Sequence, residues 1–247
     1  MAGTPGAGPI FDSGAAGALG AVVVAAGSGR RMGGVDKIFS SIAGAPVLVH
    51  VLDQLEAFPP LRSIAVVLGA ENVEACQALA AARGYRKIAG VCAGGARRQD
   101  SVRLGLECLS SVTDLDWVLV HDGARPCLDQ AILQRGLDAA REPDCGAAVA
   151  GVPVKDTIKI VSPEGLVEET PNREGLWAAQ TPQIFRFSLL WEAHSRLPED
   201  VTDDAAMVER LGHRVKMFLG SYENLKITTN EDLAVAELFL KRRSGGG

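Results

Sequence analysis

A glycine-rich stretch followed by cations is the clearest candidate for chemistry in this chain. An apolar run over residues 19–24 ends in the sequence AAGSGRRM at positions 25–32, and Lys37 follows. Because glycines lack a Cβ, their N–H groups can close on phosphate oxygens, and the nearby cations would neutralise the charge. The spacing matches neither a P-loop nor a complete dinucleotide-binding loop. It indicates a nucleoside triphosphate site; the alternative is an ordinary turn with solvated arginines.

The second candidate is Asp122, which ends an apolar strand in the sequence VLVHDGARP. Burying a carboxylate is costly unless a cation or strong donors meet it. Mg²⁺ takes oxygen ligands, needs few from the protein and fills the rest with phosphate and water. We therefore predict that Asp122 binds Mg²⁺, which Mn²⁺ could replace, with pairing to Arg125 or capping of the turn as alternatives. His121, with no evident orienting partner, is interpreted as structural rather than as a general base.

A third candidate is the sequence AGGARRQDSV at positions 93–102, where another strand ends in glycines and a helix begins. Cations at a helix N-terminus are unfavourable unless an anion lies nearby. The position of Arg98 beside Ser101 therefore favours a bound phosphate or base. The alternative is a solvated basic helix start.

Strands and amphipathic helices alternate up to Val152, which predicts an α/β fold with a mostly parallel sheet and helices on both faces. Ligands in such sheets bind beyond the carboxyl ends of the strands, where the three candidates lie. The predicted strands are Ala21 to Ala25, Ile64 to Leu68, Lys87 to Val91, Trp117 to His121 and Ala147 to Val152. The predicted helices are Pro46 to Ala57, Val73 to Arg83, Arg98 to Ser110 and Gln130 to Arg141.

The pattern changes after Val152, where residues 154–160 and 165–170 alternate apolar and polar side chains around the turn sequence SPEG. This pattern predicts a β-hairpin arm over about residues 152–172. An isolated hairpin is marginally stable and this one carries apolar residues, so we expect it to pack in a homodimer.

Composition sets the limits of these interpretations. The 247 residues are 47% apolar with a net charge of −5, which fits a single α/β domain over 19–243 and argues against a nucleic-acid or membrane partner. Residues 1–18 and 244–247 are predicted to be flexible tails, without a signal peptide. The five cysteines show no zinc-site spacing and are interpreted as buried, reduced thiols of a cytoplasmic protein.

Seven segments in a fixed order carry a family resemblance: AAGSGRRM, GGARRQDSV, VHDGARP, PVKDTIK, NREGLWAAQTPQIF, TDDAAMVE and ENLKITTNEDLAVAE. From about Leu19 to Lys241 the chain resembles the 2-C-methyl-D-erythritol 4-phosphate cytidylyltransferases of the non-mevalonate isoprenoid pathway. The resemblance implies a Rossmann-like nucleotidyltransferase fold. It also implies transfer of the cytidylyl group of CTP to a methylerythritol phosphate, with release of pyrophosphate.

The resemblance further implies residue roles. It makes Arg31 and Lys37 transition-state stabilisers and has Arg173 and Lys226 position the polyol phosphate. The implied nucleotide-binding residues are Ala25, Ala26, Gly27, Gly29, Gly95, Ala96, Arg98, Ser101 and Gly123, with Asp122 on the metal. The implied polyol-binding residues are Arg125, Thr157, Arg173, Thr181 and Lys226. The arm would carry Thr157 into the neighbouring subunit's site.

Two departures from the family pattern stand out: Lys37 lies in VDKIF where the family commonly has Pro before the lysine and Gln after it, and Ala96 replaces a common acidic residue. Other functions remain open from the residues alone. They are a cytidylyltransferase for another polyol phosphate such as ribitol 5-phosphate, a sugar-nucleotide synthetase using UTP or GTP, and a catalytically silent nucleotide-binding regulator.

Overall fold

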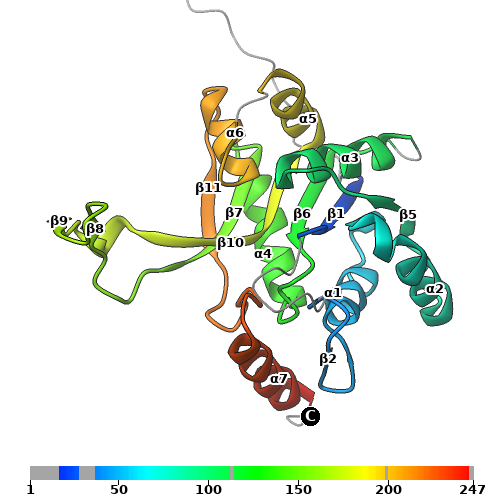
Figure 1. Ribbon diagram of the computed structural model, residues 1–247. Coiled ribbons are helices and arrows are strands. Elements are labelled where there is room, and N and C mark those ends of the chain that lie inside the picture. The colour runs from blue at the N-terminus through cyan, green and yellow to red at the C-terminus, as the bar shows by residue number, and fades with distance from the viewer. Residues whose placement is uncertain (1–16, 28–36, 112–113, 198–199, 245–247) are drawn as a thin grey trace, which may run out of the picture.

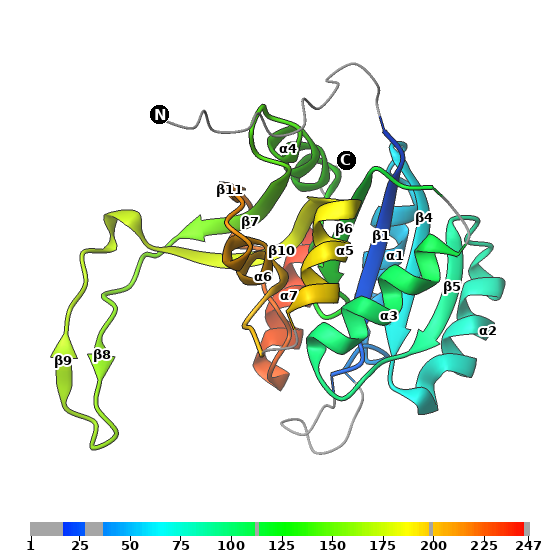
Figure 2. The same cartoon turned by 90° about the horizontal axis from the view of Figure 1, so that it is seen from above.

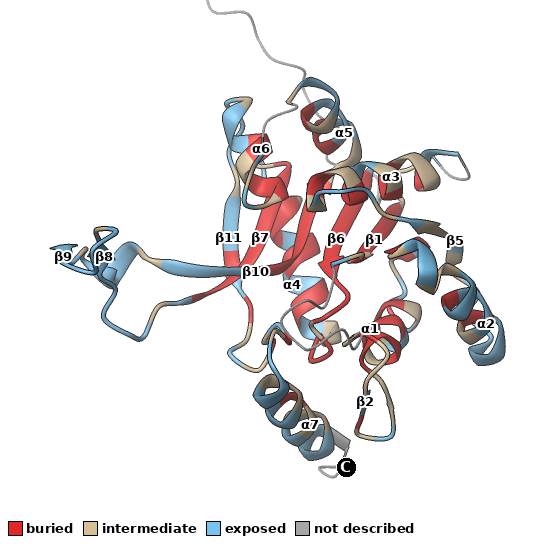
Figure 3. Cartoon of the chain, viewed as in Figure 1, coloured by how far each residue is buried: buried red, intermediate tan, exposed pale blue. Residues whose placement is uncertain are grey.

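The centre of the fold is a seven-stranded sheet in a computed structural model that describes residues 17–27, 37–111, 114–197 and 200–244. The strand order is β11-β7-β10-β6-β1-β4-β5, and β10 alone runs antiparallel to its neighbours β6 and β7. The strands are β1 (Leu19–Ala25), β4 (Leu61–Leu68), β5 (Ile88–Ala93), β6 (Trp117–Asp122), β7 (Ala147–Pro153), β10 (Trp177–Arg186) and β11 (Lys216–Leu219). The nearly continuous apolar sequences of β1, β4 and β6 follow from their burial on both faces of the sheet. Figure 3 shows β1 and β6 in the colour of buried residues.

Helices cover both faces of the sheet (Figure 1). Because side chains alternate along a strand, Ala21 and Val23 pack into one core while Val22 packs into the other. The first core includes side chains from α1 (Val47–Glu56), α2 (Val73–Arg83) and α4 (Gln130–Ala140). The second includes α3 (Arg98–Ser110), α5 (Phe187–Arg196) and α6 (Asp204–Arg210). None of the helices described is long and apolar enough to cross a membrane.

The C-terminal helix α7 (Asn230–Ser244) lies beside a small hairpin of β2 (Ser41–Ile42) and β3 (Ala45–Pro46). Ile227 and Ala236 are fully buried there with Ile42. One short 3-10 helix, Ala70–Asn72, lies directly before α2, and another, Arg173–Gly175, lies just before β10. The packing of α7 and Ile227 against the β2–β3 hairpin connects the chain after β11 to the first half of the fold.

The predicted α/β fold is confirmed, and the five predicted strands and four predicted helices are present. Two predicted boundaries differ by a residue: Ala18 is hydrogen bonded to Asp116 and Trp117, and Ser244 is the last residue of α7. Residues 1–16 and 245–247 of the predicted tails lie outside the described part of the chain.

All five cysteines are free, as predicted, but only Cys76 and Cys127 are buried. Burial raises the pKa of each of these two thiols to about 11, which keeps them protonated and unreactive near neutral pH. Cys92, Cys108 and Cys145 are partly exposed, so burial was wrong for these three.

The hairpin arm is present, and it extends away from the sheet in two views at right angles (Figures 1 and 2). Its strands, β8 (Ile160–Val161) and β9 (Val167–Glu169), are much shorter than the predicted segments. They flank the predicted turn, in which the N–H of Gly165, at φ +82°, donates to the carbonyl of Ser162. Pairing stops close to the turn, and Pro171 has no N–H with which to extend it.

Candidate functional site

Three loops that follow sheet strands come together at the carboxyl edge of the sheet. A Cβ added to Gly123, after β6, would lie 2.9 Å from the Cβ of Ala25 at the end of β1. A Cβ added to Gly94, after β5, would lie 2.5 Å from the Cβ of Ala26. Glycine is therefore required at both positions, and the predicted nucleotide-binding turns share one edge.

Asp122 is the focus of this edge and is only 6% exposed. Its Oδ2 lies 2.9 Å from Nζ of Lys226 and 3.5 Å from Nε of Arg125, while its Oδ1 lies 3.5 Å from Nε of Arg98. We call these four residues the Asp122 cluster. Burial alone would raise the pKa of Asp122, but Lys226, Arg98 and Arg125 outweigh it and hold this pKa well below its usual range. The carboxylate therefore stays ionised among three cations.

The alternative interpretation of Asp122, pairing with Arg125, is also seen, but as one of three pairings. The donor chemistry suits Mg²⁺, because Asp122 offers a hard carboxylate oxygen and Mg²⁺ needs few protein ligands. No group of three or more potential ligands from His, Cys, Asp and Glu occurs in the described ranges, so phosphate and water would supply the remaining ligands. Lys226, whose side chain is 40% exposed, is the cation best able to move aside.

The start of α3 corrects one step of the sequence argument. The cations there already have anions within the chain, because Arg97 pairs with Asp100 at 2.7 Å and Arg98 pairs with Asp204 at 2.6 Å. The unfavourable helix-dipole interaction therefore does not by itself require a bound ligand. Ser101 accepts a hydrogen bond from the N–H of Gly95 at 3.2 Å, which fixes the turn. Nucleotide binding by this turn remains a prediction.

Lys226 lies on a loop that is held in place by hydrogen bonds to the turn after β6 and to β10. Nδ2 of the buried Asn224 donates to the carbonyl of Thr181 at 2.8 Å, and Nη1 of Arg125 donates to the carbonyl of Asn224 at 2.8 Å. The N–H of Ile227 donates to the carbonyl of Ala124 at 2.8 Å. Arg125, predicted to bind the polyol phosphate, thus also holds the loop that carries Lys226.

Thr181 lies beneath the Asp122 cluster rather than at its surface. Its buried hydroxyl accepts from the N–H of Asp122 at 3.0 Å and donates to Nδ1 of His121 at 3.1 Å. Nε2 of His121 faces the carbonyl of Arg125 at 3.2 Å and must donate, so Nδ1 is the acceptor in the neutral ring. These contacts support the structural interpretation of His121 and give it partners that the sequence did not show.

We expect His121 to make the protein less stable in mild acid. Burial lowers the pKa of this fully buried ring to about 4, only partly offset by Asp122. The unfolded chain, in which the pKa is near ~6.5, binds the proton first, so the free energy of unfolding falls as the pH drops from about 6.5 towards 4. Urea denaturation at pH 7.5 and 4.5 should show a loss of about 2.5 kcal/mol from this residue.

The control for this prediction is the exposed His213. His121→Gln should remove about that much of the pH dependence relative to the parent, whereas His213→Gln should keep it. An equal pH dependence in His121→Gln and the parent would show that the buried ring is not responsible.

Two of the remaining predicted residues belong to the arm segment rather than to the loops that carry the Asp122 cluster. Thr157 and Arg173 belong to the arm segment, and Arg173 donates to the carbonyl of Lys155 near the root of the arm. Gly27 is exposed, Ala96 is exposed, and Lys37 is half-buried beyond the glycine-rich turn. Gly29 and Arg31 lie outside the described residues.

Sequence reasoning assigned no role to Asp204, His194 or Asn224. Asp204 and Asn224 are among the most buried polar residues that the structure describes. Asp204 is the first residue of α6, within the segment TDDAAMVE. A helix needs only one N-cap residue, so the second of two adjacent aspartates before an apolar run was the available signal that one of them has another role.

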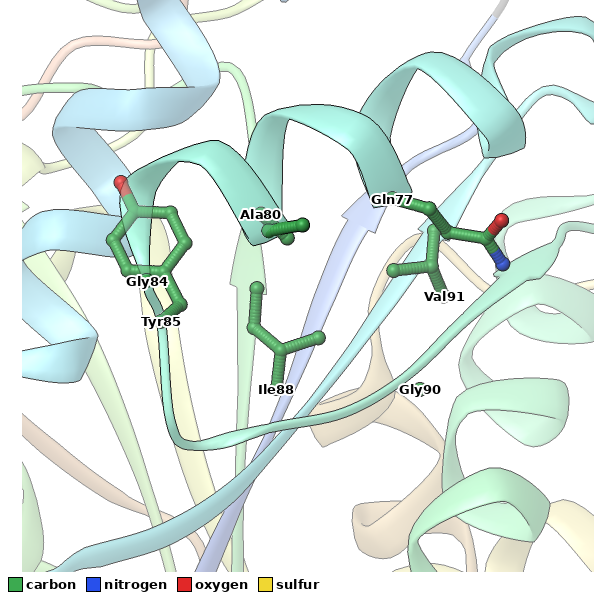
Figure 4. Close-up of a pocket in the computed structure, with 8 residues that line it drawn as sticks. Gln77, Ala80, Gly84, Tyr85, Ile88, Gly90 and Val91 are labelled. Atoms are coloured by element: carbon green, nitrogen blue, oxygen red, sulfur yellow. The ribbon is translucent and has the colours of Figure 1, made fainter.

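A separate cavity of about 420 Å³ lies between α2 and β5 (Figure 4). Its lining consists of Gln77, Tyr85 and Ile88 together with alanine, glycine and valine residues. Among the described residues that line it there is no lysine, arginine or carboxylate. A phosphate would find no counter-charge there, so the cavity is not a candidate for the triphosphate.

Comparison with known proteins agrees with the geometry. Residues 19–242 match the family model described as 2-C-methyl-D-erythritol 4-phosphate cytidylyltransferase. Proteins of that name from Dehalococcoides mccartyi and Syntrophotalea carbinolica are 49% and 45% identical, covering 91% and 89% of this chain and 96% and 94% of theirs.

Solved structures agree as well. A 4-diphosphocytidyl-2C-methyl-D-erythritol synthase from Anaerococcus prevotii superposes with a TM-score of 0.80 at 28% identity, covering 92% of this chain and 97% of that one. A 2-C-methyl-D-erythritol 4-phosphate cytidylyltransferase from Thermus thermophilus gives a TM-score of 0.70 at 30% identity, over 89% and 98%. The chain belongs to the 2-C-methyl-D-erythritol 4-phosphate cytidylyltransferase family.

Proposed function

We propose that this chain performs the reaction for which its family is named, the transfer of a cytidylyl group from CTP to 2-C-methyl-D-erythritol 4-phosphate with release of pyrophosphate. The observation that carries the proposal is the Asp122 cluster, in which one ionised carboxylate and three cations lie beside two glycine-bearing turns. Such a site suits two phosphate-bearing substrates that must approach each other. A cytoplasmic location, predicted from the cysteines, is part of the proposal.

The reaction needs charge neutralisation more than proton transfer. The attacking group is a phosphate monoester whose second pKa is near ~6, so at neutral pH it is already largely dianionic. The barrier lies in bringing this anion to the α-phosphate of CTP and in the charge that develops on the departing pyrophosphate. Lys37 and Arg31 would stabilise that charge, while Lys226 would hold the incoming phosphate in line. His121 is buried and engaged, and no step requires it as a base.

The glycine-bearing turns would hold the nucleotide. Backbone N–H groups at Ala26 and Gly27 would approach the triphosphate, and the turn at Gly95, whose own N–H donates to Ser101, would approach the ribose. Arg98, at the start of α3, faces Asp122. Asp122 would hold Mg²⁺, which when bound neutralises the triphosphate and orients it. Lys226 would then exchange its contact with Asp122 for one with the polyol phosphate.

The arm supports a homodimer with shared sites. Its apolar side chains include Leu166 at 70% exposed and Val167 at 59%, a surface that a second copy could cover. Thr157 and Arg173 lie on this arm, whereas Lys226 lies on the body of the fold. We propose that each arm delivers Thr157 and Arg173 to the partner's Asp122 cluster.

The substrate assignment is tested by measuring pyrophosphate release with CTP, UTP and GTP, each crossed with methylerythritol phosphate and ribitol 5-phosphate. The proposal predicts turnover mainly with CTP and the methylerythritol phosphate. Equal turnover with UTP would contradict the nucleotide assignment, and preference for ribitol 5-phosphate would support the alternative polyol. No turnover in any combination would favour the silent regulator.

Lys226→Ala and Arg173→Ala should raise KM for the polyol phosphate more than they change KM for CTP. The reason is that both side chains are proposed to bind the ground-state phosphate of the nucleophile, and a charge-assisted contact is worth about 1.5–3 kcal/mol, or roughly a 10- to 150-fold change in KM. Steady-state kinetics with each substrate varied would show this. Weakened CTP binding alone in Arg173→Ala would contradict its role.

A further inference from the structure

Asp204 is a carboxylate with almost no access to solvent, at 1% exposed, and it contacts the Asp122 cluster through a single guanidinium. Its Oδ2 lies 2.6 Å from Nη1 of Arg98, and its Oδ1 lies 3.1 Å from Nε2 of His194. The other edge of Arg98 faces Asp122, with Nε at 3.5 Å from Oδ1. Arg98 is therefore held between two carboxylates, more closely by Asp204.

This arrangement sets the charge balance at Asp122. Without the charge on Asp204, the nearest full negative charge for Arg98 would be Asp122, and a guanidinium can bind a carboxylate through two nitrogens. Arg98 would then bind Oδ1 of Asp122 closely, whereas in the structure its Nε lies 3.5 Å from this oxygen. Burial alone would lower the pKa of Arg98, but Asp204 and then Asp122 outweigh it and raise that pKa, so both pairings are attractive.

Local structure does not account for Asp204. The N-cap of α6 is the preceding residue, Asp203, whose Oδ1 accepts from the N–H of Ala206 at 3.0 Å. The helix therefore has its capping side chain without Asp204. A buried charge carries a desolvation cost that a neutral residue would avoid, so its presence calls for a use.

We infer that Asp204 is a positioning residue that acts through Arg98, holding the guanidinium at the nucleotide-binding turn and keeping it from a closer contact with Oδ1 of Asp122. Asp204 itself reaches neither substrate in this arrangement. The inference rests on the proposed function in one respect, because it takes the Asp122 cluster to be the site that binds CTP.

The test is steady-state kinetics of Asp204→Asn, which keeps the size and polarity of the side chain but removes its charge. We expect KM for CTP to rise about tenfold, with a smaller change in KM for the polyol phosphate, because one good charged contact corresponds to roughly that factor. In an Arg98→Gln background, Asp204→Asn should have no further effect on KM for CTP, since the residue through which it acts is gone.

His194→Gln is the matched control, because it alters the other partner of Asp204 and leaves the pairing with Arg98. It should lower Tm, as Asp204→Asn is also expected to do, while KM for CTP changes less than about twofold. A lower Tm with unchanged KM in Asp204→Asn would overturn the inference and leave Asp204 a structural residue. Equal effects of Asp204→Asn with and without Arg98 would overturn it too.

If Asp204→Asn does not fold, Arg98→Lys carries the test. A single ammonium can keep the pairing with Asp204 but has no second nitrogen with which to contact CTP at the nucleotide-binding turn. KM for CTP should again rise about tenfold, and an unchanged value would overturn the inference. The parent protein separates the two proposals: without turnover of CTP in the parent the proposed function fails, whereas normal parent turnover with unchanged variants overturns only the role of Asp204.

Discussion

Lys37→Ala is expected to lower kcat by about 10²- to 10³-fold while changing KM for CTP much less, the size of effect typical when a preorganised charge stabiliser is removed. Lys37 follows the glycine-rich turn, and its proposed contact strengthens as negative charge develops on the phosphates. Interactions that grow in the transition state affect kcat, whereas uniform binding affects KM. Steady-state kinetics at saturating polyol phosphate measure both constants.

The control for Lys37 is Lys241→Ala, which removes a surface lysine of α7 that pairs with Glu237. That variant should retain parent kinetics. A rise in KM for CTP with unchanged kcat in Lys37→Ala would show ground-state binding and would contradict its assignment. Arg31→Ala is expected to behave as Lys37→Ala does.

The second large effect is the recovery of activity from two impaired proteins, assayed at a polyol phosphate concentration well below the KM of Arg173→Ala, where that variant turns over slowly. Chains with Arg173→Ala lack an arm residue, and chains with Lys37→Ala lack a residue of the body. If each site takes its arm from the partner, a mixed dimer contains one site with both defects and one intact site. Random exchange makes about half of the dimers mixed, and each mixed dimer has one intact site out of two. Mixing the two variants should therefore restore about a quarter of parent activity.

The control is a mixture of Lys37→Ala with Lys37→Ala/Arg173→Ala, in which every site lacks Lys37. This mixture should stay inactive. No recovery after subunit exchange has been verified would place both residues in the same subunit's site. A monomer in sedimentation at the assay concentration would refute the shared site as well.

Local sequence signals predicted the parallel strands β1, β4, β5, β6 and β7, but not β11, which also runs parallel to its neighbour β7. The apolar sequences of β1, β4 and β6 could only be buried on both faces, and their order with the helices fixed the architecture. The ends of α2 and α3 were predicted to the residue because local chemistry defines them. Gly84 ends α2 in the left-handed conformation at φ +68°, and Asp100 accepts from the N–H of Arg97 at the start of α3.

The central antiparallel strand β10 was missed because its sequence argues against it. Pro182 lies within the strand, and proline is rare in a central strand because it cannot donate to the ladder. The pairing with β7 is irregular between Ala179 and Gln183, which is where the sheet accommodates the proline. No periodicity rule would have placed this strand between β6 and β7.

The site was predictable where side chains follow strands and unpredictable where it depends on distant pairing. Asp122 and the glycine turns follow from strand ends in the sequence. The contact of Arg98 with Asp204 joins residues 106 positions apart, and that of Asp122 with Thr181 joins residues 59 apart. Only the tertiary fold brings these together, which is why the charge of Arg98 was attributed to a ligand.

The most direct test of the account, that Asp122 is the centre of the transfer site, is a Mg²⁺ titration of Asp122→Asn. Asn keeps the shape but is a weaker ligand for a hard cation, so the Mg²⁺ concentration for half-maximal activity should rise about tenfold or more. Asp138→Asn, at an exposed aspartate of α4, should match the parent. A titration curve of Asp122→Asn that coincides with that of the parent would contradict the account.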